Sequence, residues 1–181
     1  MAQEARTDHH DAPVVICYDG SEHAAESIAT AAALLPGAPA VVVTVWRRIR
    51  DAILAVSIGP APLISDVTEL DERQRRAAEQ VAEEGARRAA EAGLEARPLA
   101  VLARDEVWVA VDEVAEEQDA RLIVCATRRA GITSTLLDTL PGALVHHATR
   151  PVTVVPSRQA TTARRRELLE EQKKQPRAAR A

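Results

Sequence analysis

Aromatic residues are almost absent from this chain of 181 residues, which has two Trp, one Tyr and no Phe. A packed interior must therefore come from Val, Ile, Leu and many Ala, and hydrophobic residues make up 46% of the chain. Ala-rich helices can approach a sheet closely, so this composition favours layered α/β packing over a β-sandwich. The length suits one domain with a core of its own.

Long apolar runs and paired cysteines are also lacking, which narrows the compartment. No run approaches the roughly 18 residues of a membrane span, and no N-terminal apolar stretch precedes a small-residue cleavage site. The sequence therefore predicts a cytoplasmic protein without a membrane partner. Cys17 and Cys125 each lie in an apolar run. There we expect small buried hydrophobes, since a disulfide does not persist in a reducing compartment.

Charge is distributed unevenly along the chain. Residues 157–181 have eight Lys/Arg against three Asp/Glu, a balance of +5, and because the whole chain carries −4, residues 1–156 carry −9. We expect a disordered lead-in at 1–12, a folded domain at 13–156 and a basic tail at 157–181. The tail could dock on an acidic partner, but a solvated tail, or one folded back on the acidic domain, is favoured. It has no aromatic residue to stack on bases, so we expect no nucleic-acid partner.

Short apolar runs alternate with helical patterns through residues 13–156. Strands are predicted at 13–18, 40–46, 94–103, 121–127 and 150–156, and helices from Ser21 to about 35, at 66–92, 105–118 and 136–148. Continuous β-branched runs are typical of strands buried on both faces of a parallel sheet. Residues 47–65 mix apolar residues with two prolines and a glycine, and they predict a loop.

Capping residues and apolar stripes define the predicted helices. Ser21 is a good N-cap for the first helix, Asp66 and Glu69 suggest a capping box for the second, and Gly93 suits its C′ position. The predicted inward residues are Val67, Leu70, Ala77, Ala78, Val81 and Ala89 in the second helix, and Trp108, Val111 and Ala115 in the third. Gly85 inside the second helix should cost about 1 kcal/mol relative to Ala.

Pro98 decides the expected strand order. Proline cannot donate to a sheet ladder, so we place the third strand at an edge, which favours the order 3-2-1-4-5. The predicted fold is an α/β three-layer sandwich with a five-stranded parallel sheet. Ligands of such sheets bind beyond the carboxyl ends of the strands where the order reverses. The two loops at that point are "YDGS" (18–21) and "ATRRAG" (126–131).

Three segments together resemble the universal stress protein family: "VVICYDGSEHAAESIATAAALL", "DARLIVCATRR" and "LVHHATRPVTVVP". The resemblance covers residues 13–156 and implies an adenine-nucleotide-binding-like domain that acts in stress response without an established reaction. It also implies a homodimer whose contact includes the last strand, at Pro151, Val152, Thr153, Val154 and Val155. We therefore expect a non-enzymatic regulatory module with protein partners.

Some members of this family bind ATP through a glycine pattern: Gly, two residues, Gly, nine residues, then Gly followed by Ser or Thr. At the matching positions this sequence has Ala126, Arg129, Asp138 and Thr139, with one residue fewer between the second and third. Glycines let backbone amides reach phosphate oxygens, and Asp138 would repel a phosphate by roughly 1 kcal/mol at ~4 Å in water. We expect a degraded ATP site and no cofactor.

The alternative function is a switch that binds ATP or AMP. Its candidate residues are Asp19, Val45, Ala126, Thr127, Arg128, Arg129 and Thr139. The resemblance implies that Asp19 lies beside the adenine and that Val45 lines its pocket, while the two arginines could offset the missing glycines. Each also has a plainer interpretation: Asp19 forms a turn with the two residues after it, and both arginines are solvated.

Catalysis and metal binding find little support in the sequence. Asp19, Ser21 and His23 are too close in the chain to form a triad, and no G-x-S-x-G motif is present. His146 and His147 are adjacent, so on a helix we expect one to pack and one to be exposed, and a metal would need further ligands. A third hypothesis is an enzyme that acts at the α-phosphate. It would want a richer Ser/Gly loop than "DGSEHAA".

Overall fold

The computed structural model describes residues 11–48, 67–127 and 139–157, together with Thr162, Arg165, Arg166 and Leu169. Its strands are β1 (Val14–Cys17), β2 (Pro39–Trp46), β3 (Glu95–Leu102), β4 (Leu122–Thr127) and β5 (Val152–Pro156). Its helices are α1 (Glu22–Leu34), α3 (Val67–Glu91), α4 (Val107–Glu117) and α5 (Leu140–His147). No helix within these ranges combines the length and the apolar character that crossing a membrane would need.

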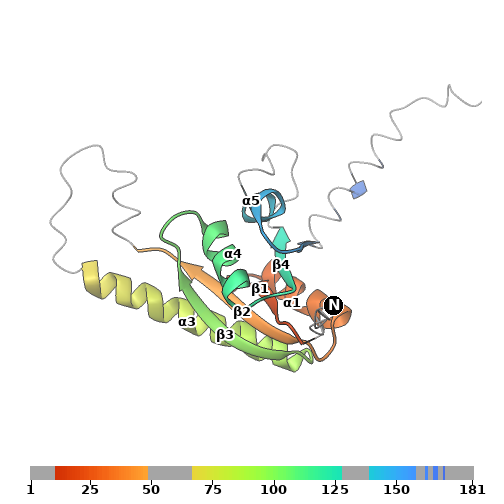
Figure 1. Ribbon diagram of the computed structural model, residues 1–181, viewed down its shortest axis with the longest axis horizontal. Coiled ribbons are helices and arrows are strands. Elements are labelled where there is room, and N and C mark those ends of the chain that lie inside the picture. The colour runs from red at the N-terminus through yellow and green to blue at the C-terminus, as the bar shows by residue number, and fades with distance from the viewer. Residues whose placement is uncertain are drawn as a thin grey trace, which may run out of the picture.

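All five strands are parallel and lie in the order β3-β2-β1-β4-β5, so the predicted fold class and strand order are confirmed. Helices α1 and α3 cover one face of the sheet, and α4 and α5 cover the other (Figure 1). Successive strand residues alternate between two cores. Ile16, Val42 and Val124 face α1 and α3, whereas Val15, Val41 and Ile123 face α4 and α5.

Helix α3 packs on the sheet through a stripe of small residues, and the predicted stripe is only partly right. The buried positions are Ala78, Ala82, Gly85, Ala86 and Ala89. The expectation for Ala77 is wrong, because it is exposed; Val81 and Leu70 are half-buried, and the side chain of Val67 lies outside the description. Hydrophobicity scores rank Val and Leu above Ala and Gly, but a helix approaches a sheet most closely along its smallest side chains.

Most of the predicted helix ends are confirmed. The Ser21 hydroxyl accepts a hydrogen bond from the Ala24 N–H at 3.2 Å, and Gly93 adopts a φ of +95° just after α3. The predicted capping box involves Asp66, which lies outside the described residues. The capping box is therefore not tested, and the Glu69 carboxylate pairs with Arg73 at 2.6 Å. In α4, Val111 and Ala115 are buried and Trp108 packs against the same core, as expected.

Pro98 lies inside β3, an edge strand, as predicted. The Glu95 N–H donates to the Ala38 carbonyl at 3.0 Å, and the Ala103 N–H donates to the Trp46 carbonyl at 2.8 Å. Since donors alternate along a parallel strand, the odd-numbered residues of β3 direct their N–H groups at β2. Pro98 falls on the side that faces away from β2, where its missing N–H costs no ladder bond.

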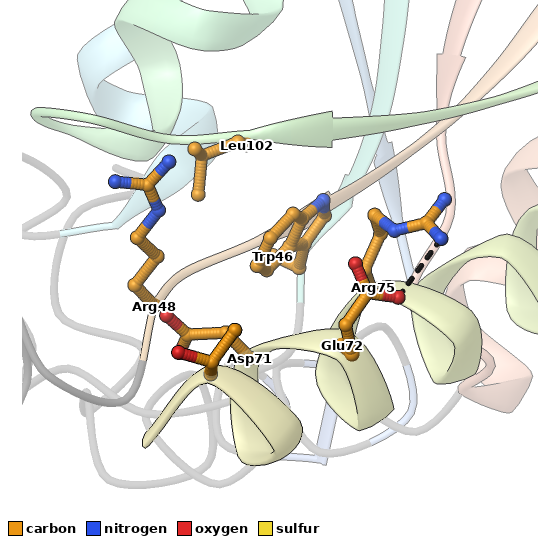
Figure 2. A pocket seen from close by; sticks show the side chains of 7 residues that line it. Trp46, Arg48, Asp71, Glu72, Arg75 and Leu102 are labelled. Atoms are coloured by element: carbon orange, nitrogen blue, oxygen red, sulfur yellow. Dashed lines mark hydrogen bonds and ion pairs between the residues drawn. The ribbon is translucent and has the colours of Figure 1, made fainter. Parts of the chain in front are cut away.

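Helix α3 is longer than the strands that it covers. Its 25 residues span about 37 Å, whereas the eight residues of β2 or β3 span about 26 Å. The helix ends next to the start of β3, so its excess length extends beyond the carboxyl ends of the strands (Figure 1). There Trp46, the last residue of β2, lies opposite the first turns of α3 (Figure 2).

Candidate functional site

The strand order reverses between β1 and β4, which lie side by side at the centre of the sheet. The chain after β1 enters α1 on one face, and β4 precedes α5 on the other face. Because the two connections diverge, the carboxyl edge of these strands is where a crevice forms in open α/β sheets. The turn at 18–21 and the described start of the second predicted loop, Ala126 and Thr127, lie at this edge, whereas residues 128–131 lie outside the described residues.

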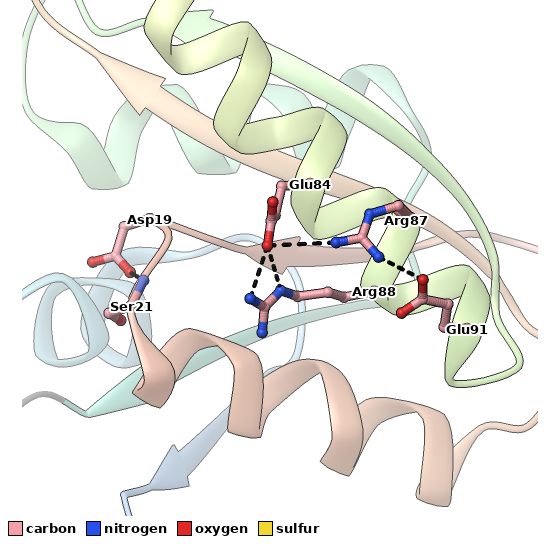
Figure 3. Close-up of polar contacts among 6 residues, drawn as sticks. All are labelled: Asp19, Ser21, Glu84, Arg87, Arg88 and Glu91. Carbon is pink, nitrogen blue, oxygen red and sulfur yellow. Dashed lines mark hydrogen bonds and ion pairs between the residues drawn. The ribbon is translucent and has the colours of Figure 1, made fainter.

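Asp19 shapes the turn after β1. Its Oδ1 accepts a hydrogen bond from the Ser21 N–H at 3.0 Å, and Gly20 between them has a φ of +81° (Figure 3). The Ser21 hydroxyl in turn caps α1 through the Ala24 N–H. This confirms the turn interpretation of Asp19. It also gives the Ser21 hydroxyl a capping role rather than that of a nucleophile in a triad.

Thr44 anchors the same turn, and the sequence analysis did not single it out. Its buried hydroxyl donates to the Tyr18 carbonyl at 2.9 Å, while the Tyr18 N–H donates to the Val43 carbonyl at 2.9 Å. These two bonds fix the exit of β1 to β2 and so position Asp19. The available signal was a single hydroxyl in the run "AVVVTVW", because a polar group inside a buried strand needs a hydrogen-bond partner.

The other candidate residues lie on the strands that border the crevice. Val45 is half-buried near the end of β2 and packs with the core under α4 and α5. Ala126 and Thr127 end β4, are both half-buried, and pair in register with Val155 and Pro156 of β5. Arg128 and Arg129 lie outside the described residues. The structure thus brings Asp19, Val45, Ala126 and Thr127 to one edge of the sheet.

Thr139, the last candidate residue, caps α5. Its Oγ1 accepts a hydrogen bond from the Gly142 N–H at 3.3 Å, and its carbonyl accepts from the Ala143 N–H at 2.9 Å. Pro141, in the first turn, has no N–H to offer. Three of the first four positions of α5 therefore have no N–H available to an anion: one is proline and two are hydrogen-bonded to Thr139. This role of Pro141 was not predicted from the sequence.

Two thiols lie on the central strands β1 and β4. Ile16 and Val124 are paired in register, so Cys17 and Cys125 follow at neighbouring positions of β1 and β4, and both are free. Burial raises the pKa of the Cys125 thiol to about 11. Burial, and after it the nearby Cys125, raises the pKa of the Cys17 thiol. Both groups are protonated at neutral pH, when a thiol is a poor nucleophile.

The two adjacent histidines of α5 differ in their ring contacts, but the expectation that one of them is packed away from solvent is wrong. The His147 ring stacks on the Trp108 indole with centroids 4.9 Å apart, and the His146 and His147 rings are tilted with centroids 6.2 Å apart. Both residues are largely exposed to solvent. Over residues 11–48, 67–127 and 139–157, no group of three or more His, Cys, Asp or Glu is placed to hold a metal ion.

The comparisons with known proteins identify the family. The sequence profile of the universal stress protein family matches residues 12–156. The chain belongs to the universal stress protein family. No curated protein sequence matches it. A structure of a member of this family from Burkholderia pseudomallei is 22% identical with a TM-score of 0.59, and the match covers 82% of this chain and 98% of that one.

Two other similar structures contain an adenine nucleotide. The universal stress protein from Archaeoglobus fulgidus in complex with dAMP is 18% identical, with a TM-score of 0.52, and the match covers 79% of this chain and 96% of that one. A universal stress protein family member from Arabidopsis thaliana with AMP bound is 14% identical, with a TM-score of 0.54. The match covers 84% of this chain and 95% of that one. At identities this low, the similarity to these structures shows a shared fold and no more.

Proposed function

We propose that this member of the universal stress protein family is a non-enzymatic, cytoplasmic regulatory module of the stress response. It acts through contacts with other proteins, and its switch-point site does not hold a nucleotide triphosphate. The observation that carries this proposal is the first turn of α5. There Pro141 lacks an N–H and the Thr139 hydroxyl engages that of Gly142, so two of the three N–H groups that a helix N-terminus offers to a phosphate are not available.

The physical argument rests on how helices bind anions. A phosphate at a helix N-terminus is held by unpaired backbone N–H groups together with the positive end of the helix dipole. A phosphate at α5 would have to displace the Thr139 hydroxyl from the Gly142 N–H. The preceding residue, Pro141, has no backbone N–H to donate. At the other side of the crevice, Ala126 brings a Cβ where the family pattern has glycine. These features act together against a tight phosphate cradle.

The state of the nucleophilic groups supports a non-enzymatic role. After β1, the Ser21 hydroxyl accepts the Ala24 N–H in the first turn of α1, and the Asp19 carboxylate accepts the Ser21 N–H. The thiols of Cys17 and Cys125 have raised pKa values and are protonated. Activated nucleophiles need the opposite, a lowered pKa or a neighbouring base.

A homodimer through β5 is part of the proposal. Pro151, Val152, Thr153, Val154 and Val155 form the outer strand and its start, and within the described residues β5 pairs only with β4. The Ile123 N–H donates to the Pro151 carbonyl, so the odd-numbered β5 residues bond to β4 and the N–H groups of Val152 and Val154 point outward. Such an edge is a template for pairing with a second chain.

The dimer is tested by replacing an outward N–H. In Val154→Pro the donor is lost, while the bonds from β5 to β4 are untouched. Val154→Ala removes the same side-chain packing and keeps the N–H, so it is the matched control. Light scattering after size-exclusion chromatography is expected to give a dimer for the parent and for Val154→Ala, and a monomer for Val154→Pro. A monomeric parent, or an unchanged dimer in both variants, contradicts this contact.

The alternative function, a switch that binds ATP or AMP, draws its support from the relatives. The similar structures from Archaeoglobus fulgidus and Arabidopsis thaliana contain dAMP and AMP. A monophosphate asks for less of the phosphate cradle than ATP does, and the adenine side of the crevice still has Asp19 and Val45 at its edge. Under this alternative, Arg128 and Arg129 replace the glycine cradle with guanidinium groups.

Calorimetric titration with ATP and AMP, with and without Mg²⁺, decides between the two functions. We expect no saturable heat with either nucleotide at millimolar concentration. The matched variants are Asp19→Ala, at the crevice, and Glu22→Ala, which removes an exposed carboxylate three residues further on. Micromolar binding that Asp19→Ala abolishes and Glu22→Ala preserves would overturn the proposal and establish the nucleotide switch.

A further inference from the structure

A second hollow lies at the carboxyl edge of the sheet, on the opposite face of β2 from Val45. It is a cavity of about 490 Å³ between the first turns of α3 and the ends of β2 and β3 (Figure 2). Val45 packs toward α4 and α5, whereas Trp46, the next residue, faces α3. This cavity is therefore separate from the switch point, and its volume is within the usual range for a small-molecule site.

Two apolar side chains from neighbouring strands line the sheet side of the cavity. Trp46 and Leu102 are partners in the parallel register of β2 and β3, so their side chains lie next to each other on the same face. Both are half-exposed, and Figure 2 shows the indole in the middle of the cavity. An accessible indole face next to an aliphatic side chain favours a flat apolar ring.

The charged side chains around the cavity differ in whether they have hydrogen-bond or ion-pair partners. Glu72 and Arg75 of α3 pair with each other at 3.0 Å, and Arg75 also bonds to Glu79. Asp71 has a polar partner as well. In contrast, Arg48 makes no hydrogen bond or ion pair with any residue in the described ranges, although its neighbour Arg47 pairs with Glu106 at 3.5 Å. The cavity therefore combines an apolar wall with one guanidinium that lacks an anion among these residues.

We infer that this cavity binds a small planar aromatic carboxylate. The ring would lie against Trp46 and Leu102, and the carboxylate would pair with the Arg48 guanidinium, whose planar fork matches it in two hydrogen bonds. Asp71 and Glu72 line the α3 side. Their charges oppose a polyanion such as a nucleotide triphosphate, so the cavity favours a ligand with one negative charge.

Tryptophan fluorescence gives a direct test, because Trp108 is the only other tryptophan. In a Trp108→Phe background, phenylacetate is the probe, 2-phenylethanol is its uncharged analogue and cyclohexylacetate is its non-aromatic analogue. We expect phenylacetate to change the Trp46 emission in a saturable way with a Kd of about 1 mM or below, as suits a ligand of this size. Each analogue should bind at least tenfold more weakly.

Four variants assign the binding to named residues. Arg48→Gln is measured by fluorescence in the Trp108→Phe background. Trp46→Leu removes the fluorescent reporter and is therefore measured by ligand-detected NMR. Both substitutions are expected to weaken the binding of phenylacetate at least tenfold. Arg47→Gln is the matched control, because it removes the adjacent arginine, and it should leave the affinity within twofold. Asp19→Ala should also leave it unchanged, since that residue lies at the switch point. Circular dichroism confirms that each variant is folded.

Three results with phenylacetate, its analogue and the arginine variants would each overturn the inference. These are no saturable signal up to 10 mM phenylacetate, which is about ten times the expected Kd; equal binding of phenylacetate and 2-phenylethanol; or equal losses in Arg47→Gln and Arg48→Gln. Competition by ATP would also overturn it, because it would merge this cavity with the nucleotide site. If the protein does bind a nucleotide at the switch point, against the proposed function, the expected results with phenylacetate stay the same. The proposed function and this inference are therefore tested independently.

Discussion

Gly85 of α3 faces the ring of Tyr18, the residue after β1, so closely that a side chain at position 85 has no room. A Cβ added there would lie 2.5 Å from the Tyr18 Cδ1 and 2.8 Å from a methyl carbon of Val42. Real Cβ contacts are not that short, so the glycine sets the distance between helix and sheet. The cost of a glycine inside a helix is offset by this close approach.

Gly85→Ala should therefore destabilise the domain, although alanine is the better helix former. Helix propensity favours alanine by about 1 kcal/mol, whereas overpacking against a ring and a branched side chain costs about 1–3 kcal/mol. We expect a net loss in the free energy of unfolding, measured by urea denaturation. In a Tyr18→Leu background, which removes the ring, the same substitution should cost less. Equal costs in both backgrounds would mean that Tyr18 does not limit the packing.

The α3 stripe also shows where prediction from sequence stops. Pro98 predicted an edge strand and with it the whole strand order, because a missing N–H has a direct geometric consequence. The small residues Ala82, Gly85 and Ala86 were not predicted to be buried, since their burial follows from the approach of α3 to the sheet. The sequence predicts features that depend on local chemistry, but it does not predict the distances between helices and strands.

The candidate site divides in the same way. The cap at Ser21 was predicted and the turn at Asp19 was one of two interpretations of that residue, because each depends on residues two or three positions away. The Thr44 hydroxyl reaches the Tyr18 carbonyl across 26 positions, and this contact required the strand order first. The Trp46–Leu102 wall required the register of β2 and β3 as well.

Asp112 holds the connection between α5 and β5, and its loss should be measurable. The buried carboxylate on α4 accepts from the Thr149 N–H at 2.9 Å and from the Thr149 hydroxyl at 3.1 Å. Asp112→Ala is expected to lower the free energy of unfolding by about 1–3 kcal/mol, because two donors lose their acceptor. Thr149→Val removes only the hydroxyl and should cost less. A larger cost for Thr149→Val than for Asp112→Ala would contradict this assignment.

The buried thiols predict a loss of stability in alkaline solution. The pKa of Cys125 is raised from 9.0 to about 11 in the folded protein, so from pH 9 upward the unfolded chain binds fewer protons than the native state. The contribution of the Cys125 thiol to the free energy of unfolding is therefore complete below pH 9. It declines as the pH rises toward 11, by up to about 1.4 kcal/mol per pH unit. Chemical denaturation between pH 8 and 10.5 should show a shallower decline in Cys125→Ala. Parallel curves for the two proteins would argue against a buried, protonated thiol.

Asp19 offers a way to separate a turn residue from a ligand-binding residue. As a turn former it needs only an acceptor oxygen for the Ser21 N–H, which asparagine also supplies. Asp19→Ala should therefore lower the melting temperature, with a cost of about 1 kcal/mol, while Asp19→Asn should stay close to the parent. The measurement is thermal unfolding followed by circular dichroism. If Asp19→Asn is as unstable as Asp19→Ala, the carboxylate charge matters to the fold. In that case a loss of nucleotide binding in Asp19→Ala could not be assigned to the crevice alone, whereas a stable Asp19→Asn variant lets its nucleotide titration report on the charge by itself.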